Sequence, residues 1–219
     1  MLLAKERQDI VDTCLFMQRE GLIVSTAGNV SIRVGDQVAI SPSGVPYETM
    51  TAEDVVVYDI DGNHVEGDLK PSSELPLHLS VYHATDAMAI THNHAPASTA
   101  LSLVVDEIPP SHYYSAMFGG VIRVAPYAEF GTDELAENVT NALKGRKGAL
   151  MSNHGAITIG SDVKKAVNLL PVLEYVCEVH LRAMASGAPI KLLTDAQMAD
   201  ALEGMSSYGV QPNKEIVPL

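Results

Sequence analysis

Short apolar segments of strand length alternate along this chain with longer segments whose apolar residues recur every three or four positions. Residues 88–92 and 156–159 are of the first kind, and residues 3–20 and 162–186 are of the second. Strands that alternate with amphipathic helices bury their apolar faces when helices cover both faces of one sheet. No repeat or linker-like tract divides the sequence. We therefore predict one α/β domain over residues 1–219.

Capping residues indicate where several helices begin. Ser73 is followed by Glu74, Leu75 and Pro76, a pattern that predicts a helix capped by the serine hydroxyl and continuing to about Ala84. A further helix is expected after Pro96, and its apolar positions would include Leu103 and Val104. The first helix follows Ser72-Ser73-Glu74 and the second follows His92-Asn93-His94. The positions of the two helix starts therefore determine where these polar side chains lie.

Later helices carry equally clear signals. Thr132 precedes an acid-rich turn and predicts a helix start, as the helix dipole favours. Pro171 lies inside the longest helical segment, where it should kink the helix or mark a delayed start. Thr194 and Gln197 form a capping box for a last helix. A polar tail is expected from Ser206 onward.

Charge and composition limit the kinds of partner. With 14 Lys+Arg and 27 Asp+Glu, the formal net charge is −13. Such a chain repels phosphate backbones and anionic lipids, so we expect neither a nucleic-acid nor a membrane partner. Its 47% hydrophobic content suits a folded core. Cys14 and Cys177 lie in expected helices, which favours buried reduced thiols and a cytoplasmic location; the mixed polarity of residues 1–20 is unlike a signal peptide.

Three histidines stand where strands are expected to end. His92 and His94 are two positions apart, and alternate strand residues point to the same face. His154 lies at a turn between two strands, next to Gly155. Three neutral imidazoles suit a catalytic divalent ion with an open coordination position, zinc above all. The pair alone is weak evidence, and the alternative for His154 is a turn histidine bonded to backbone.

Glu74 stands at an expected helix start after two serines. Its simplest role there is to stabilise the positive end of the helix dipole. If the fold brings it to the metal, it becomes a fourth ligand and a general base. The small and hydrogen-bonding residues at 26–29, 43–44 and 72–73 are of the kind that phosphate oxygens need, although each segment alone is only turn chemistry.

Other polar candidates have simpler explanations. His78 and Tyr82, on the helix after Glu74, are expected to serve in packing or at the surface. His180, in the middle of the longest helix, fits a core or interface histidine. Tyr113 lies in a loop, where its phenol is either buried or a proton donor.

Five segments in chain order resemble the zinc-dependent class II aldolase family. Four further segments are most similar to its members that act on L-fuculose 1-phosphate, and the resemblance spans nearly the whole chain. The five are Thr26-Ala27-Gly28-Asn29-Val30-Ser31, Ser43-Gly44, Pro71-Ser72-Ser73-Glu74, His92-Asn93-His94 and Asn153-His154-Gly155. The four are Ile108-Pro109 with His112-Tyr113, Ala125-Pro126-Tyr127-Ala128, Phe130-Gly131-Thr132 and Tyr208-Gly209.

The resemblance implies a three-layer α/β/α domain with a central mixed sheet. It also implies a homotetramer with active sites between subunits, Tyr113 entering from the neighbour and a mobile tail over 206–219 closing over the substrate. Met205 departs from the pattern, since those members have an aromatic residue there. The implied zinc ligands are His92, His94 and His154, with Glu74 as an acid/base that also approaches the metal. The implied phosphate pocket comprises Thr26, Gly28, Asn29, Ser43, Gly44, Ser72 and Ser73.

The activity implied by the resemblance is reversible aldol cleavage of a ketose 1-phosphate. L-fuculose 1-phosphate would give dihydroxyacetone phosphate and L-lactaldehyde, with one Zn²⁺, or another divalent ion, per subunit. A close alternative is an aldolase for a 5-deoxy- or 5-methylthiopentulose 1-phosphate. Related epimerases and decarboxylases share the metal site. A non-catalytic assembly module is the alternative of a different class, and the presence of three candidate ligands with a carboxylate argues against it.

Overall fold

Nine strands form one sheet in the computed structural model, which describes residues 1–207 of the chain. Neighbouring strands pair antiparallel, except that β7 and β8 are parallel. The sheet is therefore mixed, as predicted. In sheet order the strands are β4 (His64–Glu66), β3 (Val56–Asp59), β2 (Gln37–Ile40), β1 (Asn29–Val34), β5 (Ala89–Asn93), β9 (Gly155–Gly160), β8 (Gly148–Met151), β7 (Ile122–Ala125) and β6 (Glu107–Ile108).

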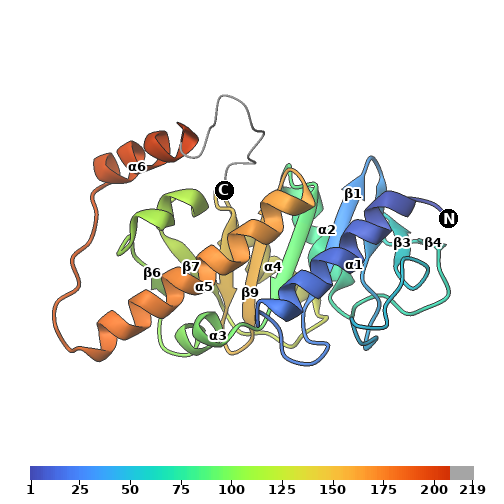
Figure 1. Cartoon of the computed structure of the whole chain (residues 1–219), viewed down its shortest axis with the longest axis horizontal. Coiled ribbons are helices and arrows are strands. Elements are labelled where there is room, and N and C mark those ends of the chain that lie inside the picture. The colour runs from blue at the N-terminus through green and yellow to red at the C-terminus, as the bar shows by residue number, and fades with distance from the viewer. Residues whose placement is uncertain (208–219) are drawn as a thin grey trace.

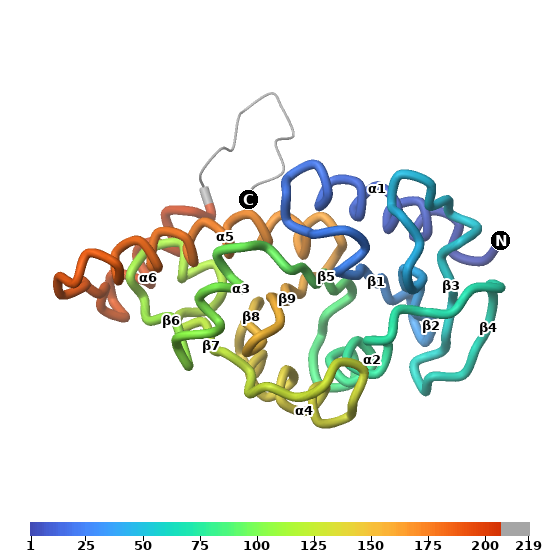
Figure 2. The backbone as a smooth tube through the Cα atoms, turned by 90° about the horizontal axis from the view of Figure 1, so that it is seen from below, coloured from blue at the N-terminus to red at the C-terminus, as the bar shows by residue number. Residues whose placement is uncertain are grey.

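Helices cover both faces of this sheet, which confirms the three-layer α/β/α prediction. Figures 1 and 2 show α1 and α5 on one face and α2 and α4 on the other. The short helix α3 packs against α5, and α6 packs against the 3-10 helix η1. The helices are α1 (Ala4–Arg19), α2 (Leu75–Ala84), α3 (Pro96–Ser102), η1 (Tyr113–Phe118), α4 (Asp133–Ala142), α5 (Val163–Ala185) and α6 (Asp195–Ser207).

Each layer buries an apolar core against the sheet. Ile10 and Cys14 of α1 pack with Leu170 of α5 on one face. Leu77 of α2 and Val139 of α4 pack on the other. At about 25 cal/mol for each Å² of apolar surface removed from water, such layers hold the sheet rigidly between them. The strand ends that carry polar side chains are therefore fixed in place.

Several local predictions are confirmed. The hydroxyl of Thr132 accepts a hydrogen bond from the backbone N–H of Leu135 and caps α4. Thr194 and Gln197 form the predicted capping box at the start of α6. Cys14 and Cys177 are both buried free thiols. Among the described residues, no helix combines the length and apolar character needed to cross a bilayer.

Two predictions about helix starts and ends are wrong. Ser73 does not cap α2: the N-cap is Glu74, whose side chain makes no capping bond because it points to other polar groups described below. The helix α3 ends at Ser102, and its last turn tightens as the N–H of Leu103 bonds back to the carbonyl of Ala100. Leu103 therefore lies beyond the helix, as does Val104, and both are exposed.

In the C-terminal third, one of the two alternatives for Pro171 and the predicted start of the tail need correction. Pro171 causes no delayed start, because α5 begins at Val163 and continues through the proline. The buried side chains of Leu170 and Leu173 on either side of Pro171 hold the helix against the core. Residues 206 and 207 belong to α6, so the predicted tail does not begin at Ser206. The rest of that tail prediction, with Tyr208 in it, concerns residues 208–219, outside the described part of the chain.

Candidate active site

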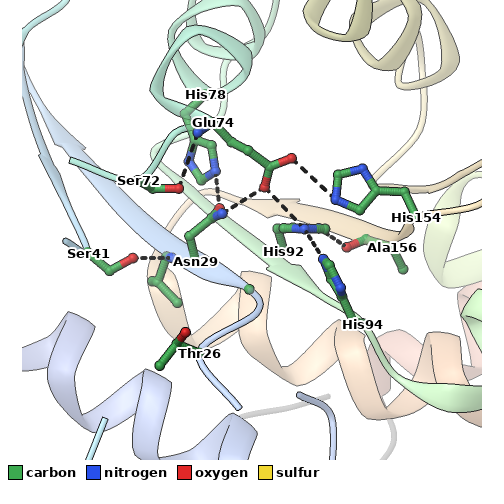
Figure 3. A network of polar contacts seen from close by, with 12 residues as sticks. Thr26, Asn29, Ser41, Ser72, Glu74, His78, His92, His94, His154 and Ala156 are labelled. Atoms are coloured by element: carbon green, nitrogen blue, oxygen red, sulfur yellow. Dashed lines mark hydrogen bonds and ion pairs between the residues drawn. The ribbon is translucent and has the colours of Figure 1, made fainter. Parts of the chain in front are cut away.

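Three histidines from two separate segments meet where the central strands β5 and β8 end and β9 begins. His92 lies on β5, where its Cα pairs with Asn29 of β1, and His94 follows one residue after the strand ends. His154 lies in the turn between β8 and β9. One ring nitrogen from each of the three histidines lies within 4.8 Å of those of the other two. Figure 3 shows the three rings facing a common point.

The turn that carries His154 depends on two neighbours with different roles. Asn153 adopts a left-handed backbone with φ of 57°, a conformation that asparagine tolerates better than most residues. Gly155 is not in that region; a Cβ there would instead stand 2.2 Å from the carbonyl oxygen of Asn93. The glycine is thus required for close approach of β9 to β5, and not for a left-handed backbone angle.

Glu74 completes the cluster from the N-terminus of α2. Its Oε2 lies 3.1 Å from Nε2 of His92 and its Oε1 lies 3.4 Å from Nε2 of His154. The side chain is almost fully buried, and Oε1 has no hydrogen-bond partner. A buried carboxylate oxygen without a partner is costly unless a cation or substrate meets it.

The donor set fits a divalent cation. Nδ1 of His92 lies 2.9 Å from the carbonyl oxygen of Ala156, so Nδ1 carries the proton and Nε2 presents a lone pair. That lone pair faces Nε2 of His94 at 2.9 Å and Oε2 of Glu74 at 3.1 Å. Zn–N bonds of about 2.0–2.1 Å at tetrahedral angles place ligand atoms about 3.3 Å apart. The separations of 2.9 and 3.1 Å lie just below this value, and the three histidine nitrogens lie within 4.8 Å of one another, so these donors could converge on one cation.

The electrostatics of the site favour neutral imidazoles beside an ionised carboxylate. Burial, together with the neighbouring histidines, lowers the pKa of His94 and that of His154 to about 4. Burial alone would raise the pKa of Glu74, but attraction to His92 and His154 outweighs it and the pKa falls below its ordinary value. Near neutral pH, His94 and His154 are therefore neutral and Glu74 is ionised, as metal binding requires.

A second layer of buried polar side chains supports Glu74. Nδ2 of Asn29 lies 2.8 Å from Oε2 of Glu74, and Oδ1 of Asn29 lies 2.6 Å from Nε2 of His78. Ser31 contacts Nδ1 of His78 at 2.6 Å and the hydroxyl of Tyr82 at 2.7 Å. His78 and Tyr82 are both buried, so the surface alternative is wrong, and the packing alternative is incomplete because both side chains also form hydrogen bonds.

A signal for this layer was present in the sequence. His78 is four residues after Glu74 on a helix, and Ser31 is two residues after Asn29 on a strand, so each pair shares a face. What the sequence could not show is that these two faces meet.

A cavity of about 410 Å³ opens beside the histidines. Pro42 and Pro71 form an isolated antiparallel bridge, and the N–H of Ser72 donates to the carbonyl of Ser41, so the two serine-bearing loops lie together. All the residues predicted for phosphate binding line this one cavity: Thr26, Gly28, Asn29, Ser43, Gly44, Ser72 and Ser73. It is also lined by Glu74, His94, Asn153, His154, Pro42, Ala27, Tyr127, Ala128 and Phe130.

Two predicted site residues do not line this cavity: His92, which lies behind it in contact with Glu74 and His94, and Tyr113. Tyr113 lies on η1, is 46% exposed, and packs among the rings of His112 and Tyr114. His180 is buried and its Nδ1 contacts the hydroxyl of Ser111 at 2.8 Å, as expected of a core or interface histidine.

With this geometry in place, comparison with known proteins identifies the family. A sequence profile described as the Class II Aldolase and Adducin N-terminal domain matches residues 8–181. The chain belongs to this family. The resemblance seen in the sequence, the fold class and the predicted enzyme class, a class II aldolase, are confirmed at this level.

Relatives match this class II aldolase over almost its whole length. The L-fuculose phosphate aldolase of Escherichia coli (strain K12) is 43% identical over 209 residues, covering 94% of this chain and 97% of that protein. The 5-deoxy-D-ribulose 1-phosphate aldolase of Bacillus thuringiensis serovar kurstaki is 37% identical over 214 residues, covering 96% and 100%. A solved structure of an L-fuculose 1-phosphate aldolase superposes with a TM-score of 0.90 at 33% identity, covering 94% and 98%.

Proposed function

We propose that this class II aldolase reversibly cleaves a ketose 1-phosphate of the L-fuculose 1-phosphate type to dihydroxyacetone phosphate and a short aldehyde such as L-lactaldehyde. The observation that carries this proposal is the shared cavity: His94, His154 and Glu74 line it together with the serine and glycine loops. A substrate with a phosphate at one end and a carbonyl next to it spans both groups. The full-length relatives named above support the same substrate class.

The loops at the far side of the cavity would bind the phosphate. They present hydroxyls and backbone N–H groups, and no lysine or arginine of residues 1–207 lines the cavity. Neutral donors at a helix start bind anions without a formal positive charge. This explains how a chain of net charge −13 could take a dianionic substrate. The residues assigned to this role are Thr26, Gly28, Asn29, Ser43, Gly44, Ser72 and Ser73.

The residues that would hold the cation are His92, His94 and His154, with Glu74 beside them. We assign one zinc ion per subunit, with other divalent ions as substitutes, because three neutral imidazoles leave the charge of the ion undiminished. When bound, the ion supplies Lewis-acid stabilisation of the negative charge that develops next to the carbonyl.

Glu74 would transfer the proton to and from C3 of the ketose 1-phosphate. In cleavage the bond between C3 and C4 breaks, its electron pair stays on C3, and the hydroxyl on C4 loses its proton as it becomes the aldehyde. Glu74 takes up a proton equivalent to the one released at C4 and then protonates C3; in synthesis it removes that proton from the hydroxymethyl carbon. Its partnerless Oε1 is the atom available for this transfer, since Oε2 accepts from Asn29.

Tyr113 would exchange the proton of the aldehyde oxygen, and it would do so from a neighbouring subunit. It projects from the surface of its own chain, outside the cavity that holds the histidines. We therefore propose a homotetramer with active sites between subunits. The buried thiols of Cys14 and Cys177 fit the reducing cytoplasm.

A second substrate class has its own support. The relative from Bacillus thuringiensis is named for 5-deoxy-D-ribulose 1-phosphate, which shares the phosphate and carbonyl end and differs in the aldehyde. Tyr127 and Phe130 line the cavity and are 64% and 63% exposed, so they stand at its rim, where they could meet the aldehyde part.

The test is a panel assay. The purified protein is incubated with L-fuculose 1-phosphate, 5-deoxyribulose 1-phosphate and 5-methylthioribulose 1-phosphate, each with and without a chelator, and both products are identified. The proposal expects aldehyde and dihydroxyacetone phosphate in equal amounts, fastest from L-fuculose 1-phosphate, and loss of activity with chelator that zinc restores. A single epimerised or decarboxylated product, or activity that survives complete metal removal, overturns it.

A further inference from the structure

A line of buried hydrogen bonds runs from Glu74 to the sheet interior, and the proposed reaction does not yet use most of it. Glu74, Asn29 and His78 form its first part, with separations of 2.8 and 2.6 Å. Ser31 and Tyr82 continue it, at 2.6 and 2.7 Å. All five residues are less than 5% exposed, so water hardly competes for these bonds. Figure 3 shows Asn29 between Glu74 and His78.

The proton positions along this line are determined by its carboxylate end. An ionised Glu74 only accepts, so the atom of Asn29 that faces it is the amide nitrogen. The carbonyl oxygen of Asn29 then faces His78 and needs a donor, so Nε2 of His78 carries the proton. Nδ1 of His78 is left as an acceptor.

The same logic continues to the end of the line. Ser31 has one hydroxyl proton and must give it to Nδ1 of His78, so its oxygen accepts from the phenol of Tyr82. Every group therefore donates toward Glu74. The low pKa of His78, about 3 because of its burial, keeps the ring neutral and this tautomer intact.

We propose that His78 is a positioning residue of the aldolase: its Nε2–H fixes the amide of Asn29, which in turn holds Oε2 of Glu74 and leaves Oε1 for proton transfer. Without this donor, the hydrogen bond that orients the Asn29 amide, with its nitrogen toward Glu74, is lost. A rotated amide would place an oxygen against the carboxylate, and the repulsion would move Glu74 away from the substrate. This inference rests on the proposed role of Glu74 as the base.

A matched pair of variants tests the proposal. In His78→Gln the side-chain amide nitrogen can take the place of Nε2 and donate to Asn29. In His78→Asn the shorter side chain can reach Ser31 in place of Nδ1 but no longer reaches Asn29. Both remove the ring and one of its two hydrogen bonds, so a purely structural role predicts similar effects on both.

We expect His78→Asn to lower kcat at least tenfold with KM changed less than twofold, and His78→Gln to recover kcat to within threefold of the wild type. Urea unfolding of both variants supplies the stability control. Equal kcat values in the two variants at equal stability would overturn the proposal, as would a loss that falls on KM alone.

A second measurement needs no activity. Nitrogen-15 NMR of the metal-free protein reports the tautomer of His78, and we expect the proton on Nε2. A proton on Nδ1 overturns the proposal whatever the kinetics show. Failure of the wild type to cleave any ketose 1-phosphate would instead contradict the proposed function, while the tautomer result would remain readable on its own.

Discussion

A Cβ atom on Gly155 would stand 2.2 Å from the carbonyl oxygen of Asn93 and 3.1 Å from Cδ2 of His94. The segment that carries His92 and His94 and the turn that carries His154 therefore pack directly against each other at Gly155, with no room for a side chain. We expect Gly155→Ala to lower the free energy of unfolding by about 2–3 kcal/mol, because a methyl group cannot fit without moving β9. Urea denaturation measures the loss, and zinc affinity should fall with it.

The matched control for that variant is Gly204→Ala on α6, where a Cβ meets no atom of residues 1–207 within 4 Å outside the helix's own backbone. Its zinc affinity should stay near that of the wild type, and its stability should not fall, because alanine favours a helix interior by about 0.5–1 kcal/mol over glycine. If Gly155→Ala is as stable as Gly204→Ala and binds zinc equally well, the close approach of the two strands is not a requirement of the site.

Replacing His94 tests the metal ligands directly. Its Nε2 lies 2.9 Å from that of His92, and its side chain lines the cavity. In His94→Ala we expect zinc affinity to fall by about 100-fold or more, since loss of a supporting residue outside the coordination sphere alone costs about 10–100-fold. Metal analysis after dialysis measures it. His64→Ala, on β4, is the control and should keep its zinc; full zinc content in His94→Ala would refute the ligand assignment.

Glu74→Gln separates proton transfer from binding. The amide oxygen of glutamine can still accept from Nδ2 of Asn29, so the variant should fold, but the side chain can no longer act as a base. We expect proton exchange at the hydroxymethyl carbon of dihydroxyacetone phosphate to fall about 10³-fold, within the usual range for a general base. Deuterium loss followed by NMR measures this rate. Undiminished exchange would remove Glu74 from the role of base.

Sequence patterns predicted most elements of the fold for local reasons. The capping box at Thr194 and the cap at Thr132 are decided by side chains within three residues, so both were correct. Sequence alone left two alternatives for Pro171, a kink or a delayed start, because its effect depends on packing; burial of the adjacent Leu170 holds α5 to the core, and the helix does not start late. The end of α3 was misplaced for a similar reason, since an apolar residue such as Val104 does not show from sequence whether it is covered.

The candidate site divides in the same way. The histidines and Glu74 were recognisable by residue type and by resemblance to a family, and the structure brings them together. The supporting role of His78 was missed because it depends on which helix face meets which strand. His78 contacts Ser31, 47 positions earlier in the sequence, and Asn29, 49 positions earlier. No local sequence pattern encodes contacts over such separations.

The stability of the metal-free protein should depend on pH through His78. Its pKa is about 3 in the folded state, against an ordinary 6.5. Between these values the unfolded chain binds a proton that the folded chain does not, so the free energy of unfolding falls as the pH falls through this window. The lowered pKa values of His94 and His154 act in the same direction.

Urea unfolding at pH 6, 5 and 4, in the presence of chelator, measures this slope. The wild type should lose about 1.4 kcal/mol more per pH unit than His78→Gln, which lacks one titrating group. The two slopes should converge above pH 7, where the imidazole is neutral in both states. Parallel slopes across the whole range would mean that His78 titrates normally in the folded protein.

The placement of Tyr113 outside its own cavity predicts complementation between two defective chains. Tyr113→Phe removes the proposed proton donor and His94→Ala removes a proposed metal ligand, so each variant alone, in the proposed homotetramer, should have low activity. When the two are unfolded together and refolded at equal amounts, a site is complete where a chain with His94 meets a neighbour with Tyr113. Random assembly in a ring gives about one quarter of wild-type activity. No recovery in a mixture shown to contain hybrid tetramers would assign Tyr113 to its own chain or to no site at all.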